Sequence, residues 1–350
     1  MPELLDLVEP ADLTQYSRLL AAELDDDTRG PSLSRFLPNR TIEGVKTRRT
    51  RVSRTQTAAK FRAFDAPTPV GKRPVAVVRD ELELAPLGQS LPIRERELIQ
   101  LALAGGNDAA AVDLVGVIYD DVRNNVAAIR NRAEQLRGGL LFSGVITINE
   151  NGFIQEADFG LAPSHNLSIS DVGDAWDDPD TDSIDQELSW LQTVESDADA
   201  SVVAMLTSRA VVNAMMKQKV YRFPLGESGG MVNRSLEAFN ALRVATGLPP
   251  VYIYDKAIAG VRITPSDKIA YVTDTVGETQ WGTTAEAVSL FGSNAVDEVT
   301  TDAPAITTAA WKEKNPVNHW TQSDATMLPV IGDINGLFNA QVLAGSSPSA

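Results

Sequence analysis

The side chains that most often perform catalysis or bind metals are sparse in this sequence. Histidine occurs at His165 and His319, which are far apart in the chain, and cysteine is absent. A zinc site or a catalytic triad needs several such groups brought together. The absence of cysteine also excludes disulfides, thiolate catalysis and thiolate metal ligands, and it fits synthesis in a reducing cytoplasm.

The motifs that bind phosphate or calcium are incomplete. The Gly71-Lys72 pair has Ala66 where a phosphate-binding loop has its first glycine. The acidic run that begins at Asp178 resembles the start of a calcium loop, but it lacks the glycine at position six and the glutamate at position twelve. We interpret it as a solvated helix start. The sequence therefore predicts no catalytic, cofactor-binding or metal-binding residue, which favours a structural protein over an enzyme.

The composition is that of a soluble globular protein. The chain has 350 residues, of which 43% are hydrophobic and 22% are charged. This length allows one large domain or two ordinary ones. No apolar run is long enough for a membrane helix, and the N-terminus lacks the pattern of a signal peptide. We therefore expect no membrane partner.

The formal net charge of −16 is distributed unevenly. Residues 145–200 contain fourteen acidic residues and no Lys or Arg. Residues 44–79 contain one acid, Asp65, against ten basic residues: Lys46, Arg48, Arg49, Arg51, Arg54, Lys60, Arg62, Lys72, Arg73 and Arg79. Such polarisation is a property of surfaces. It indicates two parts of the molecule that meet oppositely charged partners.

The elements around these segments begin with a long amphipathic helix over 113–137. Its apolar residues recur every three or four positions: Val115, Ile118, Tyr119, Val122, Val126, Ile129, Ala133 and Leu136. We expect a rod of about 37 Å, stopped at Gly138-Gly139. A shorter helix over 91–112, ending at Gly105-Gly106, precedes it. A strand over 140–148, a tight turn and a return strand over 153–159 follow.

The first ninety residues read as two extensions. Residues 1–43 form a sparse arm that needs packing on another element to be ordered. Residues 44–90 form two extended runs with polar residues on both faces, which cannot hold themselves as an isolated hairpin. A projecting hairpin that lies on another molecule resolves this. A nucleic-acid-binding loop or a solvated loop remains open, although such modules usually interleave aromatic residues.

The rest of the chain predicts a compact α/β part and a closing strand. Helices over 183–194, 208–219 and 235–247 alternate with short apolar strands such as 201–206 and 268–274. Residues 327–343 read as a strand and turn. Residues 344–350 form a flexible tail.

The order of these elements resembles a Hong Kong 97-type capsid subunit, an α+β fold. The sequence is also similar to the tailed-phage major capsid protein E family, the group that includes the lambda major head protein. Roughly residues 35–343 carry the resemblance, above all in RAEQLRGGLLFSGVITINENGFIQEADFG, DQELSWLQTV, SVVAMLTSRAVVNAMM and TMLPVIGDINGLFNAQVL. These are not catalytic signatures, so their order and spacing carry the similarity.

The resemblance implies a division of the chain into the parts of a capsid subunit. These are an N-terminal arm (1–43), an extended loop (44–90), a peripheral domain (91–160 and 276–343) with spine helix 113–137, an axial domain (161–275) and a flexible tail (344–350). The basic loop would contact acidic surfaces of neighbouring subunits through Arg48, Arg49, Arg51, Arg54, Lys60, Arg62 and Arg73.

The resemblance also implies partners. The subunits would form pentamers and hexamers of an icosahedral shell that encloses double-stranded DNA without sequence-specific binding. Assembly would take place in the host cytoplasm, with a separate scaffolding protein, a portal and a decoration protein. A lysine crosslink from Lys46, Lys60 or Lys72 is a lesser expectation. The alternatives are an encapsulin-like nanocompartment shell protein and a cytosolic α/β enzyme or binding protein.

Overall fold

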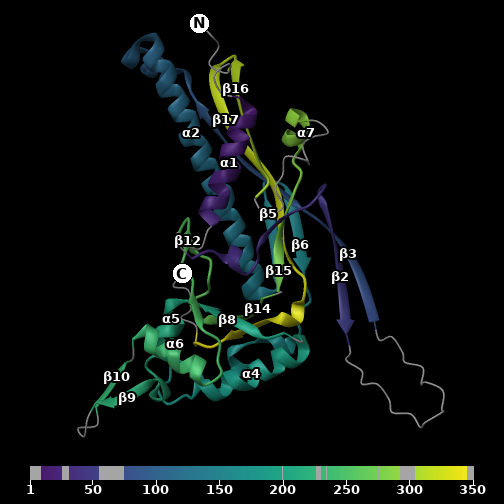
Figure 1. Ribbon diagram of the computed structural model, residues 1–350, viewed down its shortest axis with the longest axis vertical. Helices are drawn as coiled ribbons and strands as arrows, with labels where there is room; N and C mark the ends of the chain where they lie inside the picture. Colours follow the sequence, from purple (N-terminus) through teal and green to yellow (C-terminus); the bar gives the residue numbers. More distant parts are fainter. Residues whose placement is uncertain are drawn as a thin grey trace, which may run out of the picture.

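The computed structural model describes residues 9–25, 31–54, 75–198, 200–225, 230–233, 235–274, 276–291 and 304–344. In this part of the chain the fold is α+β, with one very long helix and two separate five-stranded sheets. Figure 1 shows an elongated molecule in which the long helix runs through the upper part and a group of shorter helices surrounds the lower sheet.

The longest element is helix α2, Glu95–Ser143, which has 49 residues and therefore spans about 74 Å. The prediction of two helices, over 91–112 and 113–137, is wrong in its boundaries, because neither Gly105-Gly106 nor Gly138-Gly139 ends the helix. Most of the predicted apolar stripe is buried: Ile118, Val122, Val126, Ile129 and Ala133 are at most 3% exposed, whereas Val115 and Tyr119 are partly buried. A continuous buried stripe compensates for the low helix propensity of single glycines.

Helix α2 ends where a residue must adopt the left-handed conformation. Gly144 has a φ of 70°, and its N–H donates to the carbonyl of Leu140 at 2.8 Å. Gly138 instead permits close packing against another segment, because a Cβ there would lie 2.1 Å from Cγ2 of Ile263. Because helix α2 continues to Ser143, Leu140 is helical, and the strand predicted over 140–148 begins only at Val145. Strands β5 (Val145–Glu150) and β6 (Phe153–Asp158) form the predicted hairpin, with positive φ at Asn151 and Gly152.

We expect Gly144→Ala to lower the free energy of unfolding by about 1–2 kcal/mol. The added Cβ is strained by the left-handed backbone, and it would also lie 3.0 Å from Cβ of Leu161. Gly247→Ala is the matched control, since Gly247 has a φ of 84° and no atom within 4 Å of an added Cβ. Urea unfolding of both variants separates backbone strain from the Leu161 contact. If Gly144→Ala were as stable as wild type, the requirement for glycine at this left-handed helix end would be wrong.

The first sheet covers one side of helix α2. Its strands are β1 (Asn39–Thr41), β4 (Ala85–Ile93), β15 (Gly277–Gly282), β16 (Ile306–Lys314) and β17 (Val317–Ile331). The order is β1-β15-β17-β16, and β4 also pairs with β17. Along β17, residues 319, 321, 323 and 325 are buried while 318, 320, 322 and 324 are partly exposed. One face of this sheet therefore packs on the helices and the other remains accessible.

The described part of residues 1–43 packs on this core, and packing on another element is what the sequence requires for the predicted arm to be ordered. Helix α1, Pro10–Asp25, lies beside α2 and β16 (Figure 1). Leu13, Leu33 and Leu37 are fully buried. The Oγ1 of Thr14 also donates to the carbonyl of Thr308 on β16 at 3.1 Å. These few apolar residues are enough to order the segment, because they pack against apolar surface of the first sheet and of α2.

Strands β2 (Lys46–Arg54) and β3 (Val75–Glu83) form the predicted projecting hairpin. They pair with each other and, within the described residues, with no third strand, and Figure 1 shows them standing away from the body. The loop boundary predicted at residue 90 is wrong, because β4 leaves the hairpin and pairs with β17. Residues 55–74 lie outside the described residues.

The second sheet forms the lower part of the molecule. Its order is β11-β8-β14-β18-β7, with bounds Val251–Ile253, Val202–Thr207, Lys268–Thr273, Leu337–Gln341 and Asn166–Leu167. Helices α4 (Ser183–Ala198), α5 (Arg209–Met215) and α6 (Leu236–Ala245) surround it (Figure 1), as the sequence predicts. Residues 337–343 were expected in the peripheral part with 276–336, but β18 pairs with β14, so the chain returns to this sheet.

Short elements complete the described chain. They are α3 (Ile169–Val172), α7 (Ala285–Phe291), β9 (Arg222–Leu225), β10 (Gly230–Asn233), β12 (Ala257–Ile258), β13 (Val261–Arg262) and the 3-10 turns Leu33–Arg35, Pro163–His165, Lys219–Tyr221 and Ile334–Gly336. Residues 345–350, most of the predicted tail, lie outside the described residues. Across the described ranges, no helix has both the length and the apolar character needed to span a membrane.

Candidate functional site

The projecting hairpin is fixed to the first sheet at its root. Gly44 has a φ of 85°, and its carbonyl accepts from the N–H of Thr283 at 3.2 Å. The carbonyl of Val45 accepts from the N–H of Leu84 at 2.9 Å. A Cβ on Gly282 would lie 2.4 Å from the Gly44 carbonyl oxygen, so this close approach requires glycine. The hairpin thus leaves the body in a defined direction.

The strand register divides the charge of the hairpin into two halves. Near the root, basic residues of β2 lie opposite acids of β3: Lys46 opposite Glu83, Arg48 opposite Glu81 and Arg49 opposite Asp80. Farther out, Arg51 and Arg54 lie opposite Val78 and Val75. The amino-acid composition of residues 44–79 did not predict these two halves, because the acids of β3 follow that basic segment in the sequence. The register leaves the outer half of β2 without facing acids.

The remaining predicted contact residues, Lys60, Arg62 and Arg73, lie outside the described residues. The lysines considered for a crosslink divide in the same way. Lys46 is the first residue of β2, whereas Lys60 and Lys72 lie outside the described ranges.

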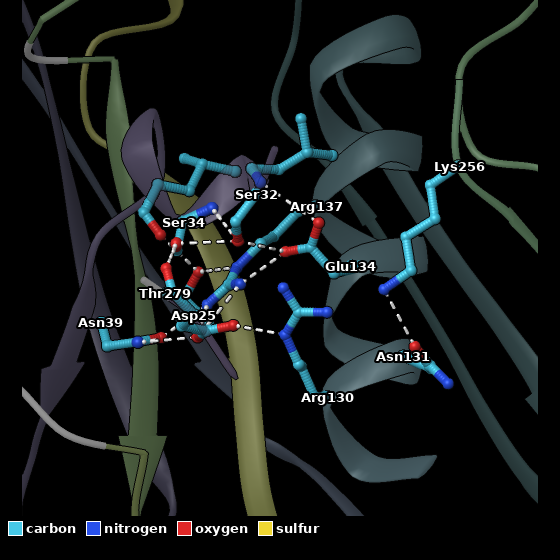
Figure 2. Close-up of polar contacts among 12 residues, drawn as sticks. Asp25, Ser32, Ser34, Asn39, Arg130, Asn131, Glu134, Arg137, Lys256 and Thr279 are labelled. Carbon is cyan, nitrogen blue, oxygen red and sulfur yellow. Dashed lines mark hydrogen bonds and ion pairs between the residues drawn. The ribbon is translucent and has the colours of Figure 1, made fainter. Parts of the chain in front are cut away.

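A buried polar cluster, here called the junction network, joins distant segments of the chain (Figure 2). Its members are Asp25, Asn39, Arg130, Glu134, Arg137 and Thr279. The side chain of Arg137 is fully buried; its Nη1 donates to Oε1 of Glu134 at 2.8 Å and its Nε to Oγ1 of Thr279 at 2.9 Å. The Nε of Arg130 donates to Oδ1 of Asp25 at 3.0 Å. Two arginines and two carboxylates therefore balance one another inside the fold.

Glu134 connects this network to the lower sheet. Its Oε2 accepts from the N–H of Leu33 at 3.1 Å and from the hydroxyl of Tyr254, which follows β11. Burial, and then the neighbouring Glu134 carboxylate, raises the pKa of Tyr254 well above its usual value. Tyr254 therefore remains a neutral donor. One carboxylate thus holds the N-terminal segment, helix α2 and the second sheet together.

A second buried network lies inside the lower part. Both terminal nitrogens of Arg243 on α6 donate to the Glu187 carboxylate on α4 at 2.7 Å, and neither side chain is exposed. The hydroxyl of Tyr271 on β14 also donates to Glu187. Burial lowers the pKa of Arg243, but the Glu187 carboxylate outweighs it and raises that pKa above its ordinary value. The ion pair therefore stays charged and fixes two helices to the sheet.

The acidic segment of the sequence forms an exposed surface on the lower part. The acidic surface comprises Asp171, Asp174, Asp177, Asp178, Asp180, Asp182 and Asp185. These residues lie on α3, on α4 and in the loop between them, at the lower end of Figure 1. Among the salt bridges of the described residues, one joins this surface to a cation, between Asp180 and Lys219. A basic partner would therefore compete with few intramolecular ion pairs for these carboxylates.

The two histidines lie in different parts of the fold. His165 is buried beside the second sheet, where its ring nitrogens lie 3.1 Å from the Leu337 carbonyl and 3.2 Å from an Asp197 carboxylate oxygen. His319 lies on β17 of the first sheet. The carboxylates of Asp178 and Asp182 accept from backbone N–H groups two residues on, at 2.9 and 3.0 Å. Within the described ranges, no group of acids and histidines is arranged to hold a metal ion.

A half-buried carboxyl on the accessible face of the first sheet predicts a pH dependence. Burial, and more weakly the nearby Glu286, raises the pKa of Asp324 from 3.8 to about 6, against a hydrogen bond from Gln322. An acid whose folded pKa is raised favours its protonated form. Its ionisation therefore removes stability as the pH rises from about 4 to about 6.

We expect Asp324→Asn to stabilise the fold above pH 6 by about 1 kcal/mol, after allowance for partial solvent screening. The advantage over wild type should shrink as the pH falls from about 6 to about 4 and vanish below about pH 3, where the wild-type carboxyl is neutral in both states. Thermal unfolding of both proteins from pH 4 to pH 8 measures this difference. An advantage that does not change with pH would contradict the assignment.

Comparison with known families identifies the class of protein. Residues 30–342 match the family model of phage major capsid protein E. The chain belongs to this family, whose members are structural proteins of the phage capsid rather than enzymes. The match confirms the predicted resemblance and favours a phage capsid protein over the enzyme and nanocompartment alternatives. No curated protein sequence matches the chain.

Solved structures agree on the fold. A prophage capsid protein from E. coli CFT073 is 16% identical, with 94% of this chain and 98% of that chain covered and a TM-score of 0.57. A phage-related protein from Bordetella bronchiseptica RB50 is 9% identical, with 97% and 99% covered and a TM-score of 0.54. The predicted Hong Kong 97-type capsid fold is thereby confirmed.

Proposed function

We propose that this chain is the shell-forming subunit of a tailed-phage head, closing as pentamers and hexamers into an icosahedral shell around double-stranded DNA. The observation that carries this function is the family match over residues 30–342, together with a capsid fold that spans nearly the whole chain. The chain carries a formal net charge of −16, and an acidic inner wall would not retain DNA through its phosphates.

The projecting hairpin is the part proposed to join neighbouring subunits. A two-stranded hairpin without a third strand gains stability by packing against another molecule. Its basic residues, Arg48, Arg49, Arg51, Arg54, Lys60, Arg62 and Arg73, would contact the acidic surface of a neighbour. Each exposed ion pair contributes about 0–1 kcal/mol, but the contact repeats at every equivalent position of a closed shell. The outer half of β2, with Arg51 and Arg54, would contribute most.

The presence of two separate sheets supports the proposed division into domains. The first sheet with α1 and α2 would be the peripheral domain, and the second sheet with α4, α5 and α6 the axial domain that surrounds the symmetry axes. The junction network would set the angle between them. A separate scaffolding protein, a portal and a decoration protein would complete the head, with assembly in the host cytoplasm.

Electron microscopy of the purified protein, with measurement of its nucleic-acid content, tests this function. Closed shells of uniform diameter that package DNA in a complete head support a phage capsid. Shells that enclose protein cargo instead would favour a nanocompartment. A compact monomer or dimer under all assembly conditions would contradict both.

A further inference from the structure

A pocket of about 460 Å³ lies beside the junction network. Its lining residues are Leu24 at the end of α1, Pro31, Arg130 on α2, Arg209 at the start of α5, Ile253 at the end of β11, and Asp255 and Lys256 after that strand. Leu24 and Ile253 supply apolar wall. The pocket thus borders the N-terminal segment, the long helix and the lower sheet at once.

The charges around this pocket are predominantly positive, although the chain as a whole carries −16. Arg130, Arg209 and Lys256 line it together with one carboxylate, Asp255. That carboxylate is already shared: it accepts from the backbone N–H of Arg209 at 3.1 Å and from Nη1 of Arg262 at 3.1 Å. The Asp255 carboxylate therefore interacts with both Arg209 and Arg262.

Arg130 reaches the pocket with donors to spare. Its side chain is 14% exposed, and its Nε donates to Asp25 at 3.0 Å. Asp25 in turn also accepts from Arg137. Within the described residues the two terminal nitrogens of Arg130 make no hydrogen bond, and Figure 2 draws this guanidinium with a dashed line to Asp25 from its Nε. Asp25 and Asp255 are thus each shared between two arginines, and the Glu134 carboxylate, which also acts on Lys256, is hydrogen-bonded to Arg137.

Lys256 is paired with a neutral group. Its Nζ donates to Oδ1 of Asn131 at 3.1 Å (Figure 2), and among the described residues no carboxylate lies within salt-bridge distance of it. Burial, followed by the positive charge of Arg130, lowers the pKa of Lys256. A half-buried ammonium next to a guanidinium is stabilised when an anion enters between them.

We propose that this pocket binds a small oxyanion of the size of phosphate between Lys256, Arg130 and Arg209. Phosphate offers several acceptor oxygens to the unused donors of an ammonium and a guanidinium, and charge-assisted hydrogen bonds are the strong ones. The bound anion would tie helix α2 and the start of α5 to the loop after β11. This site does not depend on the proposed hairpin contacts.

The test uses the purified full-length chain and inorganic phosphate. Phosphate is titrated against sodium chloride at equal ionic strength, by calorimetry and by thermal unfolding. We expect saturable binding and a rise in unfolding temperature with phosphate. Lys256→Met should weaken binding at least about tenfold. Lys312→Met, which removes an exposed cation on β16, should bind as wild type does.

Two further variants make the outcome decisive. Arg209 is 65% exposed, so Arg209→Met should weaken binding without affecting folding, should the lysine variant prove unstable. Asp26 and Asp27 lie outside the described residues but adjoin Asp25 in the sequence. Phosphate binding by Asp26→Asn/Asp27→Asn but not by wild type would show that the chain's own acids neutralise the pocket. That result, or equal binding by wild type and Lys256→Met, would overturn the proposal.

Discussion

Replacing Arg48, Arg49, Arg51 and Arg54 together with glutamate should leave the subunit folded but abolish closed shells. These residues lie on a strand whose only partner in the described chain is β3, so the body of the fold does not depend on them. At a neighbour's acidic surface, the same change converts attraction into repulsion at every equivalent contact. Circular dichroism measures whether the variant is folded, and electron microscopy measures whether it forms closed shells.

A matched control separates the position of the charge from its total. Changing Arg96, Lys217, Lys312 and Lys314 to glutamate alters the net charge equally, but on exposed positions outside the hairpin. This control should assemble better than the hairpin variant. Raising the salt concentration should weaken wild-type assembly, because exposed charges are screened over about 8 Å at physiological ionic strength. Wild-type shell yield from the hairpin variant would show that the basic strand is not an intersubunit contact.

The second large effect concerns Arg137. Arg137→Met should destabilise the subunit by about 3–5 kcal/mol, because it leaves the buried carboxylate of Glu134 without its arginine and removes one of two arginines from Asp25. The residue is fully buried, so water cannot replace the lost donors. Denaturant unfolding of the isolated subunit gives the free-energy difference.

Two comparisons test the origin of that loss. Arg132→Met lies on the same helix and breaks an ion pair with Glu150 whose side chains are 38% and 58% exposed; we expect a loss below about 1 kcal/mol. In the double variant Glu134→Gln/Arg137→Met, the loss should be smaller than the sum of the single losses, because the unpaired charge is removed. Strictly additive losses would mean that Glu134 and Arg137 do not stabilise each other.

The sequence predicts the parts of this fold that local pattern controls. The buried stripe from Ile118 to Ala133 follows from spacing alone, as does the Asn151-Gly152 turn. Glycine was harder to interpret, because the same residue type ends the helix at Gly144 and permits close packing at Gly138. Which use applies depends on whether another segment, here Ile263, lies against the helix.

The remaining errors share a physical cause, which is contact between residues distant in the chain. Strand β4 looks like the continuation of the hairpin until β17 is present to pair with it. Likewise, β18 joins the lower sheet because β14 offers a free edge there. The junction network combines residues from 25 to 279, and no spacing in the sequence brings Asp25 to Arg137. The site that joins the two parts was therefore beyond prediction.

The most direct test of the central claim is a reconstruction of the assembled particle by electron cryomicroscopy. The claim is that the hairpin of β2 and β3 joins neighbouring subunits of a shell. We predict a closed icosahedral shell in which each hairpin extends over an adjacent subunit, with Arg51 and Arg54 facing its acidic residues. A closed shell in which the hairpin contacts only its own subunit would contradict the claim.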